Sequence, residues 1–569
     1  MAPSANPLAD VQQQFLLLQQ SHSHLLHDHA HLQEQHAHVL NQLSITLQSI
    51  NEQAVEIQSL KDEIARLKGT SPRPKLPPSR LSGSSSGSGD SKKDGKPGRG
   101  QHLRKNKQGL SFHRHERLKP SSIPDGAVFK GTRKYDVQNI ICQAYNTRYI
   151  IERWELPDGT YLEGQLPAYV QGHYGPELRA HVLTLAYSCR MPEELILEQL
   201  HRYKIAISAG QLHEMLTENH EAFHSEKENI LKAALESGRI QTDEVGTRHQ
   251  GKNCYTNVIC NEFFVYLTTS DSKSRINFLK ILAQGRNEYR FNQDAYNYLT
   301  VHKGAEKLLQ VLKMRGDFLV NTDDPEKSFK NELGHLNAIE IRLMTESGLL
   351  ASLIEHGVPR DLNIHSDDAG QFEVFRQSLC WIHEERHYRK LIPVHPEMAA
   401  EIERIRDDIW QLYKDLKIYK TTPSEAECTR LSQVFEALFN PEKATPYPIL
   451  NDRLALTYAK RDRLLFVLEH PTTPLHNNLS EIGGRGSKVK SKISGGTRSN
   501  EGRRAWDTFG SLNLTCRRLV ICFHDYLMDR FLNLKIFPLL GDIIRDRIKT
   551  ANGPPLVVSE AVNMMLSTS

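Results

Sequence analysis

The stretch that decides the fold is RIQTDEVGTRHQGKNCYTNVICNEFFVYLTTSDSKSRINFLKILAQ, residues 239–284. Its apolar runs and turn residues predict three strands and then a helix, at 239–243, 254–260, 263–270 and 275–284. A mainly helical segment follows to about 360, and a further strand is expected at 362–365. The order β-β-β-α…β predicts a sheet with a helical insertion.

Two helical insertions interrupt the predicted sheet. The first occupies about 285–360, and the second occupies 396–470, which is rich in Glu, Arg and Leu. Around them, the strand order matches an α/β ribonuclease-H-like catalytic core at 236–395 that is completed at 471–540. The chain has 569 residues, which exceeds the size of a domain with a single hydrophobic core, so the predicted fold class is multidomain.

Three acidic residues stand in settings that favour metal binding. Asp243 ends its strand-like run, Asp367 directly follows a strand, and Glu481 comes after a turn-forming Asn pair. Carboxylates that converge at strand ends can hold two Mg²⁺ ions, which clamp both sides of a phosphoryl displacement. The pattern therefore predicts a nuclease or strand-transfer site.

A seven-residue apolar repeat predicts a coiled coil at 11–68. With Phe15 at heptad position a, three successive a positions are His22, His29 and His36. A polar seam that weakens the pairing or sets its register is favoured here over a metal-binding role. We expect this helix to join copies of the chain into a homo-oligomer.

A basic linker without apolar periodicity is predicted at 69–120. Its first part, 69–108, carries ten Lys or Arg and two Asp, which gives 10 − 2 = +8. Such a segment can bind nucleic acid through counterion release, and it can equally be a soluble spacer. At the far end of the chain, 541–569 is predicted to be a tail.

Two small units precede the predicted core. Residues 121–172 predict a β-rich unit, with a strand at 147–154 followed by a Pro-Asp-Gly turn. Residues 173–235 predict a helical unit, in which Pro192 opens the second helix and Ser208 begins a capping box for the third. Such a unit is either a helix-turn-helix DNA reader or a purely structural trio.

Composition argues against several classes of protein. The chain has 72 Lys or Arg and 68 Asp or Glu, so only local charge is informative. Its eight cysteines include no Cys-x-x-Cys pair, which argues against a zinc ribbon and for reduced thiols in the cytoplasm. No secretory signal or membrane-spanning run of about 20 apolar residues is expected. No Gly-rich phosphate loop indicates use of ATP.

A basic run follows Glu481. Residues 485–518 hold nine Lys or Arg against Glu501 and Asp507, which gives 9 − 2 = +7. The nine are Arg485, Lys488, Lys490, Lys492, Arg498, Arg503, Arg504, Arg517 and Arg518. Beside a phosphoryl-transfer site, contact with the DNA backbone is favoured over an ordinary solvated face.

Six blocks of sequence, taken in order, resemble one family. They contain the settings of the three acids and the segments between them, and they lie at 241–253, 271–278, 366–372, 380–386, 477–481 and 493–499. From about 120 to 535, their order and spacing are similar to those of DDE transposases of the insertion-sequence sixty-six type. The resemblance implies a ribonuclease-H-like core that cleaves and joins DNA at element ends with two Mg²⁺ ions, for which Mn²⁺ is a substitute.

The resemblance also assigns roles to single residues. Asp243 and Glu481 match the first and third catalytic acids, and Asp367 matches the second, with Asp368 as the alternative. The expected partners are the DNA of the element ends and target, further copies of the chain, and accessory proteins. The expected location is the cytoplasm, on the nucleoid when the protein is bound to DNA.

The segment after Asp368 has two interpretations. Cys380, His383 and His387 have passable spacing for zinc, with a fourth ligand such as His365 required from elsewhere. The resemblance instead places this segment beside the second catalytic strand, which favours packing for Cys380 and, for His383 and Arg386, contacts either with phosphate or with the residues that hold the metal. Zinc is the less favoured of the two.

The chain departs from the family pattern next to the third acid. The usual Asp before the Asn pair is His476, and the usual Arg after Glu481 is Ile482, followed by Gly483 and Gly484. Two glycines cost about 2 kcal/mol in a helix interior, so we expect this helix to break or end early. Two alternative functions follow: a catalytically impaired DNA-binding remnant, and a coiled-coil interaction protein.

Overall fold

The computed structural model describes residues 112–170, 172–442 and 445–550. The predicted coiled coil at 11–68, most of the basic linker and the end of the tail lie outside these residues. The chain divides into two units, 1–133 and 134–569, and each is described by itself. In the described part of the first unit, 112–133, the backbone forms neither helix nor strand.

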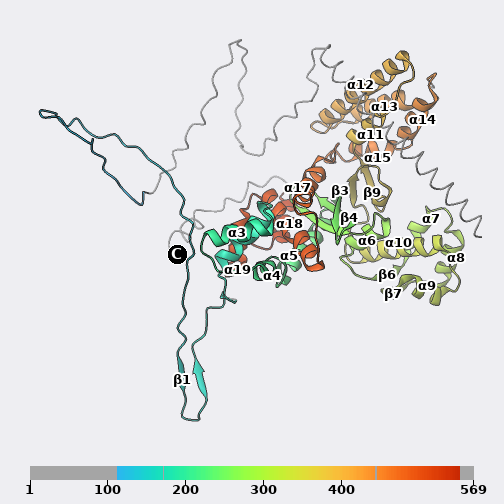
Figure 1. Cartoon of the computed structure of the whole chain (residues 1–569). Helices are drawn as coiled ribbons and strands as arrows, with labels where there is room; N and C mark the ends of the chain where they lie inside the picture. The colour runs from blue at the N-terminus through green and yellow to red at the C-terminus, as the bar shows by residue number, and fades with distance from the viewer. Residues whose placement is uncertain (1–111, 171, 443–444, 551–569) are drawn as a thin grey trace, which may run out of the picture. The chain divides into compact units, whose positions relative to one another are not determined.

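A two-stranded hairpin lies near the start of the second unit. Strand β1 Arg153–Glu155 pairs antiparallel with β2 Tyr161–Glu163 (Figure 1). The predicted turn is present, with Gly159 at φ +81°. The strand predicted at 147–154 begins only at Arg153, because a two-stranded ribbon without a packed face supports little regular structure.

The predicted helical unit is present. Its elements are α2 Pro176–Leu183, the π-helix η1 Thr184–Ser188, α3 Glu193–Arg202, α4 Ala209–Thr217 and α5 Glu221–Glu236. Pro192 directly precedes α3, and Ser208 forms the predicted capping box with Gln211 at the start of α4. Helices α4 and α2 pack against α18 Asn500–Leu519 and α19 Phe523–Leu532, respectively.

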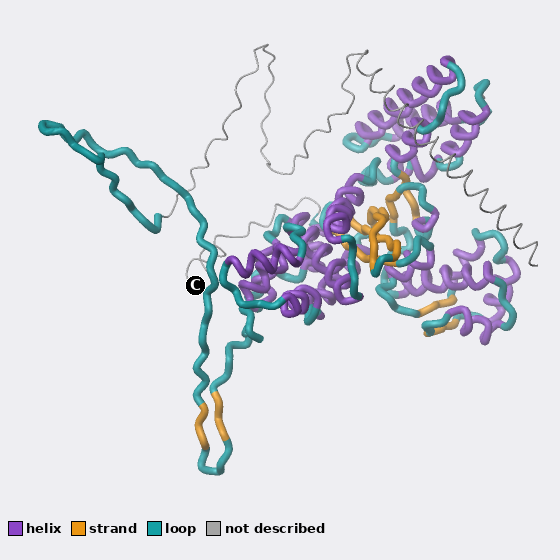
Figure 2. Tube along the Cα trace, in the orientation of Figure 1, coloured by secondary structure: helices purple, strands orange, loops and turns teal. Residues whose placement is uncertain are grey.

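A five-stranded sheet follows (Figure 2). Its strands are β3 Arg239–His249, β4 Lys252–Cys260, β5 Val265–Ser270, β8 Asn363–Ser366 and β9 Arg376–Leu379. They lie in the order β5-β4-β3-β8-β9, antiparallel from β5 to β3 and parallel from β3 to β9. The 3-10 helix η2 Gly370–Phe372 connects β8 toward β9. This mixed sheet is compatible with the predicted ribonuclease-H-like core.

Strand β3 is longer than predicted. Asp243 does not end it but lies in its interior, paired with Val258 of β4. The strand continues because its polar second half pairs with the start of β4 across a two-residue turn. In that turn Gln250 and Gly251 have φ values of +50° and +75°, the sign that the tightest hairpin turns require.

Apolar side chains cover both faces of the sheet, as its mixed topology requires. On one face, Ile240, Ile259 and Ile364 join the large core that also contains α5. On the other face, Val258, Val265 and Leu267 form a smaller cluster with side chains of α17 Asn478–Ser494 and α18. The sheet is therefore held between the N-terminal helical unit and the C-terminal helices.

The first insertion is mainly helical, as predicted, and also contains a short hairpin. The helix predicted at 275–284 is α6 Arg275–Leu282, and the elements of the insertion are β6 Glu288–Phe291, α7 Gln293–Thr300, α8 Glu306–Arg315, β7 Phe318–Asn321, α9 Pro325–Leu333 and α10 Ala338–Glu355. Strands β6 and β7 pair antiparallel, and α10 packs on β6. The four-residue strands are too short to show an alternating pattern in the sequence.

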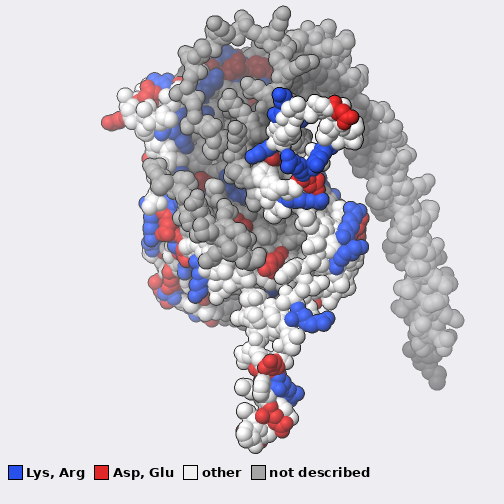
Figure 3. Space-filling view, turned by 90° about the vertical axis from the view of Figure 1, so that its left-hand side faces the viewer, with Lys and Arg blue, Asp and Glu red and all other residues white. Residues whose placement is uncertain are grey.

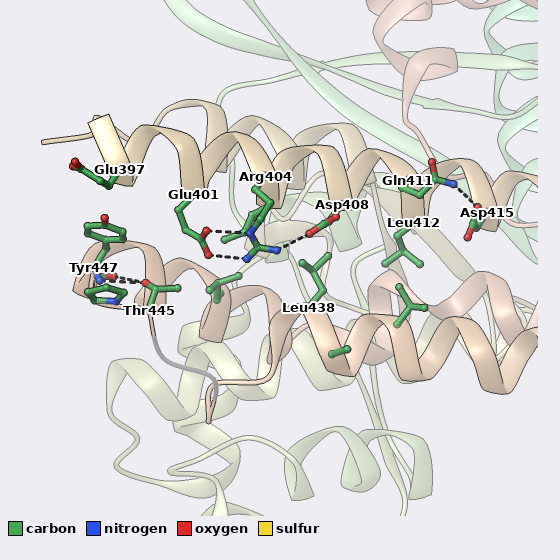
Figure 4. Close-up of a pocket in the computed structure, with 15 residues that line it drawn as sticks. Glu397, Glu401, Arg404, Asp408, Gln411, Leu412, Asp415, Leu438, Thr445 and Tyr447 are labelled. Carbon is green, nitrogen blue, oxygen red and sulfur yellow. Dashed lines mark hydrogen bonds and ion pairs between the residues drawn. The ribbon is translucent and has the colours of Figure 1, made fainter. Parts of the chain in front are cut away.

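The second insertion is helical, as predicted, and has its own core. Its elements, after α11 Trp381–Arg389, are α12 Pro396–Tyr419, α13 Glu425–Phe439, α14 Pro448–Tyr458, α15 Arg461–Leu464 and α16 Phe466–Glu469. The core is built on Trp381, Phe435 and Phe439. A groove of about 810 Å³ lies along α12 and α13, where Arg404 bonds Glu401 and Asp408 (Figure 4).

The described part of the chain ends in helices α17 to α20, the last being α20 Leu540–Lys549. The expected break in α17 is wrong: the helix runs unbroken through Gly483 and Gly484 to Ser494. Both glycines face the sheet, where a Cβ at Gly484 would lie 2.4 Å from Cγ2 of Val245. The close packing of α17 against the sheet therefore requires glycine at this position, and helix propensity does not take such a contact into account. In the described part of the chain, no helix is long and apolar enough to cross a membrane.

Candidate active site

Asp243 occupies the middle of the sheet, on β3 beside β8 and β4. The strand sets its position, because its neighbours Gln241 and Thr242 are buried between the paired strands. The Asp243 side chain is half-buried, and its Oδ1 accepts a hydrogen bond from the Glu244 N–H at 2.8 Å. Among the described residues, no Lys or Arg forms an ion pair with Asp243.

Asp367 directly follows β8, as predicted from the sequence. Since β8 runs parallel to β3 with His365 opposite Gln241, the chain after β8 brings Asp367 level with Asp243. The Oδ1 atom of Asp367 accepts a hydrogen bond from the Ala369 N–H at 3.3 Å. The next residue behaves differently: Asp368 forms ion pairs with Lys460 at 2.5 Å and Arg463 at 3.6 Å.

Glu481 lies in the first turn of α17, and a buried asparagine fixes where that helix begins. Asn477 donates from Nδ2 to the carbonyl oxygen of Thr242 at 2.8 Å, one residue before Asp243. Its backbone N–H donates to Sγ of Cys380 at 3.3 Å. The start of α17 is thus joined both to the strand of the first acid and to the start of α11.

The negative charges of Asp367 and Glu481 act on Asp243. The pKa of Asp243 is raised to about 6, first by burial and then by the negative charges of Asp367 and Glu481, against the bond from Glu244. The structure therefore brings these three carboxylates into one electrostatic neighbourhood. A site that gathers negative charge in this way favours a cation or a proton.

Two residues of α11 approach Glu481. Its Oε1 lies 3.6 Å from NH1 of Arg386 and 3.8 Å from Nε2 of His383. Arg386 also donates to Nε2 of His383 at 3.0 Å, so this ring nitrogen accepts and the imidazole is neutral. Burial and the Arg386 charge lower the pKa of His383. The pair places one positive charge at the edge of the acidic site.

The oxygen donors of the three acids suit a hard divalent cation by their chemistry. The raised pKa of Asp243 supports this fit, because a bound cation would relieve the burial of its carboxylate. The described residues nevertheless contain no ready-made group of three His, Cys, Asp or Glu side chains around one point. A cation would therefore take part of its shell from water and substrate, as Mg²⁺ commonly does.

The described residues also contain no group of three side chains that could form the alternative zinc site. The Sγ atom of Cys380 accepts the Asn477 N–H, and burial raises the pKa of its thiol. His365 is fully buried, and its Nδ1 shares a hydrogen bond with Ser378 at 3.0 Å. His383 faces Glu481 and Arg386 instead.

The predicted DNA-binding residues differ in exposure. Those whose side chains are exposed are Arg485, Lys488, Lys492, Arg498 and Arg504, the last paired with Glu221. Arg503 is half-buried and pairs with Asp271 at 3.6 Å. Lys490 turns inward, donates to the Met191 carbonyl and has its pKa lowered to about 8 by burial. On the face drawn in Figure 3, Lys and Arg are interspersed with Asp and Glu.

Two residues near the site were missed in the sequence. Glu244 accepts a hydrogen bond from Gln371 at 3.0 Å and lies 3.5 Å from Lys273, and burial raises its pKa. Asn477 carries a buried Oδ1 without a hydrogen-bond partner among the described residues. Both stand beside predicted acids, which was the only signal that the sequence offered.

Comparison with known proteins identifies the family. The family described as Transposase IS66 matches residues 171–307, a range that includes Asp243. An uncharacterized protein of Sinorhizobium fredii, y4jO, is 35% identical over 304 residues, which are 53% of this chain and 94% of that relative. The chain belongs to the IS66 transposase family. Membership in this transposase family agrees with the sheet and with the resemblance found in the sequence.

Proposed function

We propose that this IS66 family member is an active DDE transposase that cleaves and joins DNA at the ends of an insertion sequence. The observation that carries the proposal is the placement of three acids on adjoining elements: Asp243 on β3, Asp367 directly after the parallel strand β8, and Glu481 in the first turn of α17, whose start is bonded to β3 through Asn477. Buried carboxylates usually acquire a basic partner. The absence of one for Asp243 among the described residues supports a functional role.

Asp243, Asp367 and Glu481 would hold two Mg²⁺ ions, which when bound supply positive charge to the attacking and leaving oxygens of a phosphodiester. In the proposed in-line displacement, an oxygen of water or of a DNA 3′-hydroxyl forms the new P–O bond while the P–O3′ bond of the attacked phosphodiester breaks. The attacking oxygen loses its proton to solvent, and the leaving 3′ oxygen takes one up as a hydroxyl. Arg386 lies beside Glu481, where its guanidinium can bind a non-bridging phosphate oxygen, and His383 accepts from Arg386 and so helps to position it.

The second acid is assigned to Asp367 in this proposal. Asp367 influences both Asp243 and His383, whereas Asp368 is bound by Lys460 and Arg463. Asp367→Asn should abolish cleavage, and Asp368→Asn should weaken it. The opposite ranking would reassign the second acid.

DNA is the proposed partner, and the exposed basic residues of α17 are its proposed backbone contacts. We leave Lys490 out of this set because it is turned inward. Self-association, accessory proteins and a location on the nucleoid remain predictions from the sequence.

The test uses the full chain and duplexes made from the DNA that flanks its coding sequence. We expect strand nicking that requires Mg²⁺ or Mn²⁺, stops in EDTA and is lost in Asp243→Asn. Binding without nicking by the wild-type protein would instead support the DNA-binding remnant. The continuous α17 helix removes the argument from Gly483 and Gly484 that had favoured that alternative.

A further inference from the structure

The two residues on either side of Asp367 are both held by the second insertion. On one side, Ser366 Oγ accepts a hydrogen bond from Nε2 of Gln377 at 2.9 Å. Arg463, in α15, donates in turn to Oε1 of Gln377 at 2.9 Å. A basic residue of the insertion thus reaches the end of β8 through one glutamine side chain.

On the other side, Asp368 contacts the insertion directly. Lys460, just before α15, places Nζ 2.5 Å from Oδ2 of Asp368, and Arg463 lies 3.6 Å from Oδ1. The side chain of Lys460 is 9% exposed and that of Asp368 is 34% exposed, so this ion pair is partly shielded from water. A partly buried pair is screened by salt less than a surface pair.

Lys460 is itself fixed in place by a buried carboxylate. Its Nζ lies 3.2 Å from Oε2 of Glu384, a side chain that is 3% exposed on α11. Glu384 also accepts from Oγ1 of Thr457 at 2.6 Å and pairs with Arg453. The ammonium group therefore bridges a rigid part of the insertion and the loop that carries Asp367.

We propose that Lys460 and Arg463 are positioning residues, which hold the loop at 366–368 so that Asp367 faces Asp243. This inference rests on the proposed function, because it assigns the insertion a role at the same acidic site. The alternative is that the cluster merely packs the insertion against the sheet. The two differ in what a broken Lys460–Asp368 pair does to metal binding.

The test compares Lys460→Met with Arg406→Met in the full chain. Arg406 pairs with the buried Glu385 at 2.7 Å in the same insertion, and it does not contact the loop at 366–368. We measure the Mg²⁺ concentration that gives half-maximal thermal stabilisation, and the same midpoint for nicking. Loss of an outer-shell partner typically weakens metal affinity about 10–100-fold, which is the change expected for Lys460→Met.

Arg406→Met should leave the Mg²⁺ midpoint unchanged even if it lowers the melting temperature, and Lys460→Arg should restore most of the wild-type midpoint. Equal midpoints in Lys460→Met and wild type would overturn the inference while leaving the proposed function intact. So would equal shifts in Lys460→Met and Arg406→Met.

A second measurement separates this inference from the proposed function. In metal-free protein, hydrogen exchange at 366–370 should quicken in Lys460→Met and not in Arg406→Met. If the wild-type protein shows neither Mg²⁺ stabilisation nor nicking, the proposed function fails, and the exchange result still decides whether Lys460 holds the loop. Unchanged exchange in Lys460→Met would overturn the inference.

Discussion

Two buried acids in this molecule are treated in opposite ways. Glu226, on α5, is 4% exposed, and its carboxylate accepts four hydrogen bonds. Both oxygens accept from Arg530. One oxygen also accepts from the Tyr526 hydroxyl, and the other also accepts from the Leu540 N–H. Asp243, on β3, accepts from its neighbour's N–H and faces two further acids. The arrangement around Glu226 stabilises the fold. The arrangement around Asp243 leaves its carboxylate without a basic partner among the described residues.

The difference shows how an acidic site can be recognised in a protein without bound ions. A carboxylate that the fold uses is surrounded by donors, which compensate for the loss of water. A carboxylate that binds a cation lacks such donors, and its negative charge is compensated only when the cation is bound. By this criterion Asp243 is a candidate for the proposed functional site, whereas Glu226 belongs to the scaffold.

The largest expected effect is on catalysis at Asp243. Asp243→Asn should reduce Mg²⁺-dependent nicking by more than the 10–100-fold typical of an outer-shell partner, because it removes a proposed ligand. DNA binding by the variant, measured by fluorescence anisotropy, should stay close to that of the wild type. Nicking at the wild-type rate would contradict the role of Asp243.

The next effect concerns Glu226 and is on stability alone. Glu226→Gln removes the charge-assisted bonds from Arg530, which keeps Asp529 as its second buried carboxylate, and this loss should lower the free energy of unfolding by about 1.5–3 kcal/mol. Urea denaturation measures this loss. Where the variant is still folded, its nicking rate per folded molecule should be unchanged, and a specific loss of nicking would blur the distinction between the two acids.

The third effect tests how α17 reaches the sheet. Gly484→Ala puts a methyl group 2.4 Å from Cγ2 of the stiff Val245 side chain, so we expect a loss of about 1–3 kcal/mol in unfolding free energy. Helix propensity alone predicts a gain of about 1 kcal/mol. Gly486→Ala is the matched control, because its Cβ would meet Arg190 at an ordinary 3.4 Å. A stabilised Gly484→Ala would remove the packing explanation for the glycines.

A smaller effect is the pH dependence of stability in EDTA. An unfolded Asp loses its proton near pH 4, and folded Asp243 does so at about 6, so the folded state binds more protons between these values. Stability from protonated Asp243 is therefore present below pH 4 and is lost as the pH rises through 6. Asp243→Asn should be more stable than wild type by about 1–2 kcal/mol at pH 7, after allowance for partial exposure, and equal near pH 4. A constant difference across this range would point to another cause.

The smallest effect concerns the outer face of α17. Arg485→Ala with Lys488→Ala should weaken binding to all DNA sequences alike and reduce the salt slope of log K by about 0.9 for each phosphate contact removed. Lys307→Ala with Lys313→Ala, two exposed lysines on α8, removes the same charge elsewhere. Equal effects of the two double variants would mean that α17 makes no specific contact.

The parts of the fold that could be predicted are those with a local cause. Asp367 follows an apolar run that becomes β8, and Ser208 caps α4 through residues next to it in sequence. The second half of β3 was missed because its side chains are polar, and only pairing with β4 makes it a strand. The break expected at Gly483 and Gly484 was wrong because a tertiary contact outweighed propensity.

The residues of the candidate site divide in the same way, into those that the local sequence predicts and those that depend on contacts between distant segments. Its acids could be found because each has a distinctive neighbourhood in the sequence. The bond from Asn477 to Thr242 and the pair between Lys460 and Asp368 join residues far apart in the chain. Without homologous sequences to compare, no pattern in one chain connects such residues.

The attachment of α17 to β3 at both ends also limits how this protein can change in length. The helix begins where Asn477 bonds to Thr242, and just beyond its end Thr497 forms a bridge with His249. A helix advances about 1.5 Å per residue and a strand about 3.3 Å. A helix and a strand that are joined at both ends must span the same distance, which only a few pairs of residue numbers allow. Insertions and deletions should therefore accumulate in the two helical insertions and be rare between 477 and 497, where one residue more would break one of the two attachments.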